Sequence, residues 1–93
     1  MNKLYRFKWN CGRMGDVEGL FVENENLVAE KIGSELYFGE ILGKHSEVFG
    51  TLSEEDLVGV SEDQDFIDRL VELLGYSISG FNPLDYIEED EEI

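Results

Sequence analysis

Two residue types that support chemistry are scarce in this 93-residue chain, which has one cysteine, Cys11, and one histidine, His45. One cysteine excludes an intramolecular disulfide. One residue of each type cannot complete the tetrahedral set of Cys and His ligands that zinc prefers. The single histidine lies in an expected turn beside Lys44 and Ser46, without an evident partner for acid–base catalysis, which favours a local structural role.

Long apolar runs and basic residues are scarce as well. No stretch approaches the roughly 18 apolar residues that a membrane-spanning helix needs. The basic start, MNKLYRFKW, is not followed by the apolar core of a signal peptide. We therefore expect a cytoplasmic protein. Only 7 Lys and Arg residues accompany 22 Asp and Glu residues, which gives a formal net charge of −15.

The few basic residues are concentrated at the start of the chain. Lys3, Arg6, Lys8 and Arg13 are four of the seven, so residues 14–93 carry a formal charge of −19. A net charge of roughly 2 to 8 keeps a small domain soluble, so solubility alone does not explain this excess. Such a field repels nucleic acid and anionic membranes and attracts basic protein surfaces. We predict a basic nucleic-acid-binding protein as the partner, with no direct contact to nucleic acid or membrane.

Two segments resemble ligand-binding loops only superficially. In 61–68 (SEDQDFID), Phe66 and Ile67 stand where a calcium loop needs glycine and a polar ligand. The segment 12–15 (GRMG) lacks the Gly-Lys-Ser/Thr of a phosphate loop and a helix after it. Cys11 has no nearby basic residue or histidine that could activate it other than Arg13, so we expect a structural thiol. The sequence therefore predicts no metal, no cofactor and no enzymatic activity.

The chain is nonetheless expected to fold. Its composition, 42% hydrophobic and 12% aromatic, is too apolar for intrinsic disorder. Its length suits one modest hydrophobic core. Residues 1–87 are predicted to form a single domain. The acidic run that follows has nothing to pack, so residues 88–93 are predicted to be a disordered acidic tail.

Alternating hydrophobicity predicts several strands. Within 3–10, Tyr5, Phe7 and Trp9 alternate with other residues, which indicates a strand with a buried aromatic face. A loop rich in glycine then leads to a second strand at 17–22, which makes a hairpin. Further strands are predicted at 35–42, 46–52 and 57–61, and a turn at 43–45 joins the first two as a second hairpin.

Two helices are predicted from caps and from a 3.6-residue period. The first covers 25–32, with Asn24 as its N-cap. The second covers 62–74 and begins with a capping box formed by Ser61 and Gln64. Its apolar stripe, which we expect to lie on the sheet, consists of Phe66, Ile67, Leu70, Val71, Leu73 and Leu74.

The order β-β-α-β-β-β-α-(β) predicts an α+β fold with two helices against a small, mostly antiparallel, twisted sheet. Gly39 and Gly50 lie inside strand patterns and predict bulges or sharp curvature, so the sheet could also be partly closed. The segment 76–87 is expected to be extended, to turn at Asn82-Pro83 and to end in apolar anchors. These anchors are Leu84, Tyr86 and Ile87.

Carboxylates recur at regular spacings on the predicted elements. On a helix, side chains three or four residues apart stand about 5–6 Å apart at Cβ, which is comparable to the spacing of successive phosphates along a nucleic-acid strand. A rigid fold with such rows can occupy a groove whose basic residues bind a duplex backbone, with fast and salt-sensitive association. The predicted partner-binding residues are Glu54, Glu55, Asp56, Glu62, Asp63, Asp65, Asp68 and Glu72.

In size, charge, expected α+β fold and lack of catalytic residues, the chain resembles the small acidic proteins of phages and mobile elements that mimic nucleic acid, such as anti-restriction and anti-CRISPR proteins. The resemblance implies an inhibitor of a host defence nuclease or CRISPR effector. The alternatives are an adaptor domain with incidental acidity and an enzyme or metal-dependent protein. An exposed apolar patch rimmed by charge would favour the adaptor. A deep polar pocket around His45 or Cys11 would favour the enzyme.

Overall fold

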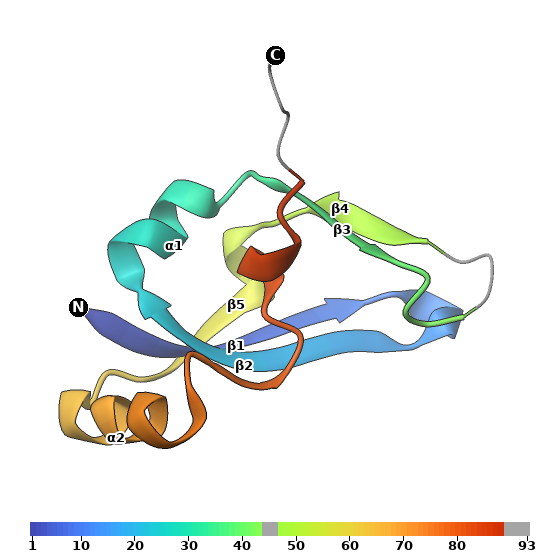
Figure 1. Cartoon of the computed structure of the whole chain (residues 1–93). Helices are drawn as coiled ribbons and strands as arrows, with labels where there is room; N and C mark the ends of the chain where they lie inside the picture. The colour runs from blue at the N-terminus through green and yellow to red at the C-terminus, as the bar shows by residue number, and fades with distance from the viewer. Residues whose placement is uncertain (44–46, 89–93) are drawn as a thin grey trace, which may run out of the picture.

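The computed structural model describes residues 1–43 and 47–88, which form six strands and two α-helices (Figure 1). The predicted α+β class and the order of the elements are confirmed. The strands are β1 (Asn2–Asn10), β2 (Asp16–Asn24), β3 (Glu35–Gly39), β4 (Val48–Thr51), β5 (Leu57–Ser61) and β6 (Ser77–Gly80). The helices are α1 (Glu25–Lys31) and α2 (Gln64–Leu74), and the short 3-10 turns are η1 (Gly12–Met14), η2 (Glu54–Asp56) and η3 (Pro83–Tyr86).

A four-stranded sheet with the order β5-β1-β2-β6 forms the middle of the molecule. Its two central strands, β1 and β2, are a long hairpin that pairs without interruption from Asn2↔Asn24 to Asn10↔Asp16. The shorter strands β5 and β6 flank this hairpin, and each runs antiparallel to its neighbour. The first predicted hairpin is therefore the centre of the main sheet.

The second hairpin, β3–β4, is a separate two-stranded sheet. It lies with α1 and η3 on one side of the main sheet, and α2 lies on the opposite side (Figure 1). The molecule thus has three layers, and the main sheet packs against other elements on both faces. Among the described residues, no helix combines the length and the apolar character that crossing a membrane requires.

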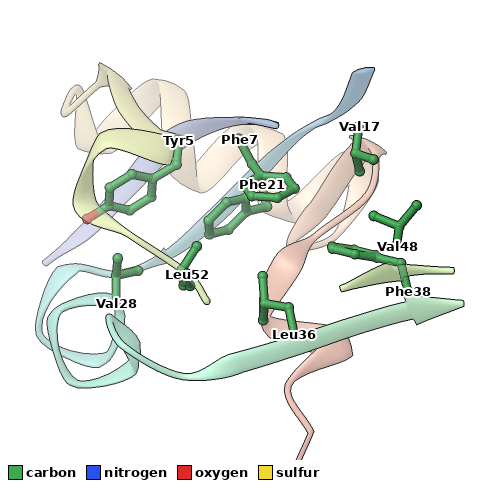
Figure 2. Packing of buried hydrophobic residues seen from close by; sticks show 9 residues of the cluster. All are labelled: Tyr5, Phe7, Val17, Phe21, Val28, Leu36, Phe38, Val48 and Leu52. Atoms are coloured by element: carbon green, nitrogen blue, oxygen red, sulfur yellow. The ribbon is translucent and has the colours of Figure 1, made fainter. Parts of the chain in front are cut away.

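The main core fills the space between the two sheets. Phe7 of β1 is fully buried and faces Phe38 of β3, with ring centroids 6.0 Å apart. Arg6 and Lys8, its neighbours on the strand, are exposed, so the predicted burial of the aromatic face of residues 3–10 is confirmed. The buried members of this core are Tyr5, Phe7, Val17, Phe21, Val28, Leu36, Phe38, Val48 and Leu52 (Figure 2).

A smaller core lies between the other face of the main sheet and α2. Its buried members are Leu4 of β1, Val22 of β2 and Ile67 of α2. The expectation that the whole apolar stripe of this helix lies on the sheet is wrong, because Leu73 and Leu74 are 65% and 57% exposed. In α2 only Ile67 is fully buried, and Leu70 and Val71 are partly buried against the same core.

Both helices begin at a side-chain cap. Asn24 caps α1 as predicted, since its Oδ1 accepts a backbone amide of the first turn at 2.8 Å. The predicted capping box of Ser61 and Gln64 on α2 is wrong, because Ser61 is still the last residue of β5. The N-cap is Asp63, whose Oδ1 accepts the Phe66 amide at 3.3 Å.

The two strand glycines have different roles. Gly39 has a φ of 79° and lies where the register between β3 and β4 shifts, as the bulge prediction requires. For Gly50 the bulge prediction is wrong, since this residue pairs in register with Leu36. Its missing side chain makes room for the Trp9 indole instead, because a Cβ at position 50 would lie 3.3 Å from Cη2 of that ring.

The segment after β6 returns to the second hairpin and completes the main core. The ring of Tyr86 lies 4.6 Å from that of Phe38, centroid to centroid, and the neighbouring apolar side chains of η3 pack on the same core. The predicted anchoring of this segment is confirmed. Glu88 donates its amide to the Glu35 carbonyl at 2.8 Å, one residue beyond the predicted end of the domain. The rest of the predicted acidic tail, 89–93, lies outside the described residues.

Candidate functional site

The eight predicted partner-binding carboxylates fall into two groups. One group forms η2, just before β5, on the side of the second hairpin, where it lines two grooves. The other lies on α2 and in the loop that leads to it, on the opposite side of the main sheet (Figure 1). The sheet therefore separates them. The first group is Glu54, Glu55 and Asp56, and the second is Glu62, Asp63, Asp65, Asp68 and Glu72.

Three of these carboxylates serve the fold. Oδ2 of Asp56 accepts the Ser53 amide at 2.9 Å and so completes a capping box on η2. Asp63 is the N-cap of α2. Glu62 lies 3.8 Å from Nζ of Lys3, and a solvent-exposed pair of this kind contributes about 0–1 kcal/mol. The other five carboxylates are the better candidates for contact with a partner.

Three carboxylates of the second group form a row on α2. Asp65, Asp68 and Glu72 are exposed and are spaced three and four residues apart, so they share one flank of the helix. Arg69, the one basic residue of α2, stands at helical spacing from the first and last of them and weakens the field of the row. Both ion pairs found within residues 1–43 and 47–88 involve lysines of β1. The row is therefore available to an external cation.

The other flank of α2 exposes apolar side chains. Phe66 is 48% exposed and Leu73 is 65% exposed. These two residues are seven positions apart, which is about two helical turns, so they lie on the same side of the helix. Tyr76, which follows the helix, is 49% exposed. The helix thus presents an apolar patch beside an acidic one, and such a patch is typical of protein-interaction surfaces.

A groove of about 460 Å³ opens between β4 and the end of β1, and we call it the β4 groove. The pairing of β5 with β1 goes only as far as Leu57↔Phe7, so β5 does not cover the edge of β1 beyond that point. Residues of η2 contribute the remaining wall. The lining includes Trp9, Cys11, Glu47, Gly50, Glu55 and Asp56.

The β4 groove combines an aromatic surface with negative charge. The Trp9 indole packs edge to face against Phe38, with centroids 5.5 Å apart and an interplanar angle of 82°. Glu47, Glu55 and Asp56 supply three carboxylates, and none of the described residues that line the groove is basic. An aromatic face near carboxylates suits the side chain of a lysine or an arginine.

A second groove, of about 620 Å³, lies between α1 and the strands β1 and β5. It contains Lys3 together with Tyr5, Glu25 and Glu54. Burial of the phenol, followed by the charges of Glu25 and Glu62, raises the pKa of Tyr5 above its ordinary value. Nζ of Lys3 lies 5.9 Å from the centroid of the Tyr5 ring. This groove therefore already has a cation of its own, which weakens its attraction for a basic partner.

Cys11 and His45 are the two residues around which the sequence left an enzyme site open. Cys11 is half-buried and lines the β4 groove, where its ionisable neighbours are carboxylates, whereas basic groups are what activate a thiol. His45 lies outside the described residues. Within residues 1–43 and 47–88, no three His, Cys, Asp or Glu side chains are grouped so that they could hold a metal ion.

No protein-family model, no curated protein and no solved structure matches the chain. The function is therefore inferred from the surface of the molecule. The sequence did not reveal the β4 groove, because the alternation along 3–10 places Trp9 on the buried face and Glu47 falls within the predicted strand at 46–52. Alternation along β1 shows which face Trp9 belongs to. It does not show that a short β5 leaves this end of β1 open.

Proposed function

We propose that this chain is a non-enzymatic acidic binding protein that inhibits a nucleic-acid-binding protein by occupying its basic groove. The observation that carries the proposal is the row of exposed carboxylates on α2, Asp65, Asp68 and Glu72. The helix is attached to the sheet through the fully buried Ile67, so the row keeps its spacing when a partner approaches. A host defence nuclease or CRISPR effector fits this charge, in keeping with the resemblance to phage inhibitors.

The acidity would act on both association and contact. A net charge of −15 steers a basic surface toward the chain and raises the association rate, most strongly at low salt. At contact, a carboxylate can accept hydrogen bonds from an arginine or lysine that otherwise binds phosphate. Of the eight predicted partner-binding carboxylates, the five without a capping or ion-pairing role would supply these contacts. They are Glu54, Glu55, Asp65, Asp68 and Glu72.

The apolar flank of α2 favours a second candidate function. Phe66 and Leu73 are large, are 48% and 65% exposed, and lie on the helix that carries the acidic row. Full burial of such a side chain at an interface contributes about 1.5–3 kcal/mol. This flank suits a protein-interaction domain whose partner presents an apolar surface and for which the acidity is incidental.

The two candidates place opposite flanks of one helix in the interface, which allows a matched test. The immobilised chain is used to capture protein from a bacterial lysate, and the captured protein is eluted with a salt gradient or, separately, with a short DNA duplex. The proposal expects elution by both. It also expects much weaker capture by the variant Asp65→Asn/Asp68→Asn/Glu72→Gln, with Phe66→Ser/Leu73→Ser as the control that captures normally.

The opposite pattern supports the second candidate. A complex that resists both salt and duplex, and that is lost with Phe66→Ser/Leu73→Ser alone, would show that the apolar flank is the interface. Circular dichroism of both variants checks that α2 is retained. The substituted side chains are all exposed, so the fold should tolerate their replacement.

A further inference from the structure

The β4 groove carries an inference of its own. We propose that it binds an extended basic segment of a protein partner, which pairs with the open edge of β4 and places a lysine or arginine side chain against Trp9. The groove lies on the opposite side of the main sheet from the acidic row of α2. The inference therefore shares with the proposed function only the basic character of the partner.

Two strand edges border the groove. β4 pairs with β3 along one edge, for example through Gly50↔Leu36. No strand of the described chain pairs with its other edge, which lines the groove over Val48–Thr51. β1 loses its β5 partner beyond Phe7. Backbone N–H and C=O groups at open edges bind an added strand through main-chain hydrogen bonds, so an extended segment is the occupant that this geometry favours.

Trp9 is held in one position at the groove. Its indole contacts Phe38 edge to face and lies 5.4 Å from the Phe7 ring, centroid to centroid. Gly50 lets the indole lie against the backbone of β4, since a Cβ there would come within 3.3 Å of the ring. The exposed part of the indole faces the groove. A fixed aromatic surface of this kind binds both the cationic head of a lysine or arginine and its aliphatic stem.

Charge determines which extended segment fits. Glu47 and Glu55 are exposed at the groove, and Asp56 lines it with one oxygen already bound to the Ser53 amide. The charge of Glu47 is the largest cause of the raised pKa of Tyr37 on the neighbouring strand, and a side-chain hydrogen bond between the two residues adds to it. An acidic segment would be repelled and a neutral one would leave the carboxylates unmatched. A basic segment pairs with these carboxylates and also suits the aromatic surface of Trp9.

The test uses the fact that Trp9 is the only tryptophan of the chain, so its fluorescence reports on the groove. The probe is an acetylated hexa-arginine peptide, titrated into the full chain. We expect a saturable change in Trp9 fluorescence and amide shifts in Val48–Thr51 by NMR. Glu47→Gln/Glu55→Gln should weaken binding by about fivefold or more, as expected for the loss of two exposed ion pairs. Asp56 is left unchanged because it caps η2.

The matched control is Asp68→Asn/Glu72→Gln on α2, which changes the net charge by the same amount. It should alter the affinity for the peptide by less than about twofold, because only long-range charge is lost. Equal weakening by both double variants would overturn the inference, since the peptide would then sense net charge alone. Equal binding of an uncharged Thr-Val hexapeptide would overturn the role of the carboxylates. Absence of shifts in β4 would overturn the site.

The peptide titration and the lysate experiment test the β4 groove and the proposed function separately. The lysate experiment depends on the row on α2 and is scored by displacement with duplex DNA. If hexa-arginine does not bind the β4 groove but duplex still displaces the captured protein, the proposed function stands without the groove. If the peptide binds in β4 and no duplex-sensitive partner is captured, the groove stands without the proposed function.

Discussion

The carbonyl oxygen of Phe81 occupies the space that a side chain at Gly19 would need, because a Cβ at position 19 would lie 1.9 Å from it. Phe81 also donates its amide to the Glu18 carbonyl at 3.0 Å, so the chain that leaves β6 crosses β2 in direct contact. Gly80, with a φ of 66°, forms the bend. The crossing brings Phe81 beside Phe38, with ring centroids 5.7 Å apart, and leads η3 to the main core.

Gly19→Ala is therefore expected to lower the free energy of unfolding by about 3 kcal/mol or more, the upper end of overpacking costs, since backbone rather than a side chain would have to move. The control is Gly59→Ala on β5, where the new Cβ would meet the flexible Lys3 side chain at 3.3 Å. That change should stay within about 0.5 kcal/mol. Urea denaturation measures both, and similar losses would contradict the importance of the crossing.

Ile67→Ala should destabilise the chain far more than Leu74→Ala. Ile67 is fully buried between α2 and the sheet, whereas Leu74 is 57% exposed. A buried Ile→Ala change costs about 2–5 kcal/mol, and an exposed substitution usually stays within about 0.5 kcal/mol. The midpoints of urea unfolding compare the two variants. Ile67 and Leu74 are seven positions apart on the same side of α2, so a larger loss for Leu74→Ala would mean that the last turn of the helix, rather than Ile67, carries its packing on the sheet.

The sequence was sufficient to predict the features that depend on a repeating pattern of side chains or on residues a few positions apart. The alternation of Tyr5, Phe7 and Trp9 predicted that the aromatic face of β1 packs in the main core, and the Asn24 cap placed the start of α1. Both features depend on residues close together in the chain. The same holds for the anchoring segment after the turn at Pro83, whose apolar side chains pack as predicted.

The errors arise where distant segments meet. The stripe of α2 has the helical period, but the period does not show which of its side chains meet the sheet, and Leu73 and Leu74 are largely in solvent. Gly50 suggested a bulge, yet its role is set by Trp9, forty-one residues earlier. The β4 groove likewise depends on where β5 ends relative to β1. Each of these three features depends on contacts between segments that are far apart in the chain, and a local sequence pattern does not contain that information.

Tyr5 should make the chain less stable at alkaline pH. Burial, with the charges of Glu25 and Glu62, raises its pKa above the ordinary value of 10.0. Below pH 10 the phenol holds its proton in both states. As the pH rises further, the unfolded chain loses the proton first, so the free energy of unfolding falls until the folded phenol ionises as well.

Urea denaturation at pH 9 and pH 11 checks this expectation. Tyr5→Phe should reduce the loss of stability between these two pH values, because the phenyl ring keeps the packing and carries no ionisable group. Tyr76→Phe, which removes a phenol that is 49% exposed, is the control and should keep the loss unchanged. An unchanged loss in Tyr5→Phe would show that other groups cause the alkaline dependence.

Two deletions at the acidic end of the chain distinguish the effect of its charge on stability from the effect of its packing. Deleting 89–93 removes four carboxylates and leaves the hydrogen bond between the Glu88 amide and the Glu35 carbonyl possible. Deleting 84–93 also removes Tyr86 from the Phe38 ring. We expect the short deletion to keep or raise the melting temperature, because like-charge repulsion decreases. The long deletion should lower it by several degrees, because the main core loses apolar contacts.

The short deletion should also affect the kinetics of binding to the protein captured from the lysate. Long-range charge acts mainly on the encounter, so its association rate should fall at low salt and approach that of the full chain at high salt. The dissociation rate should stay nearly unchanged, because the contacts assigned to Asp65, Asp68 and Glu72 remain. Surface plasmon resonance at two salt concentrations measures both rates. A faster dissociation at every salt concentration would place the binding contacts in residues 89–93 rather than on α2.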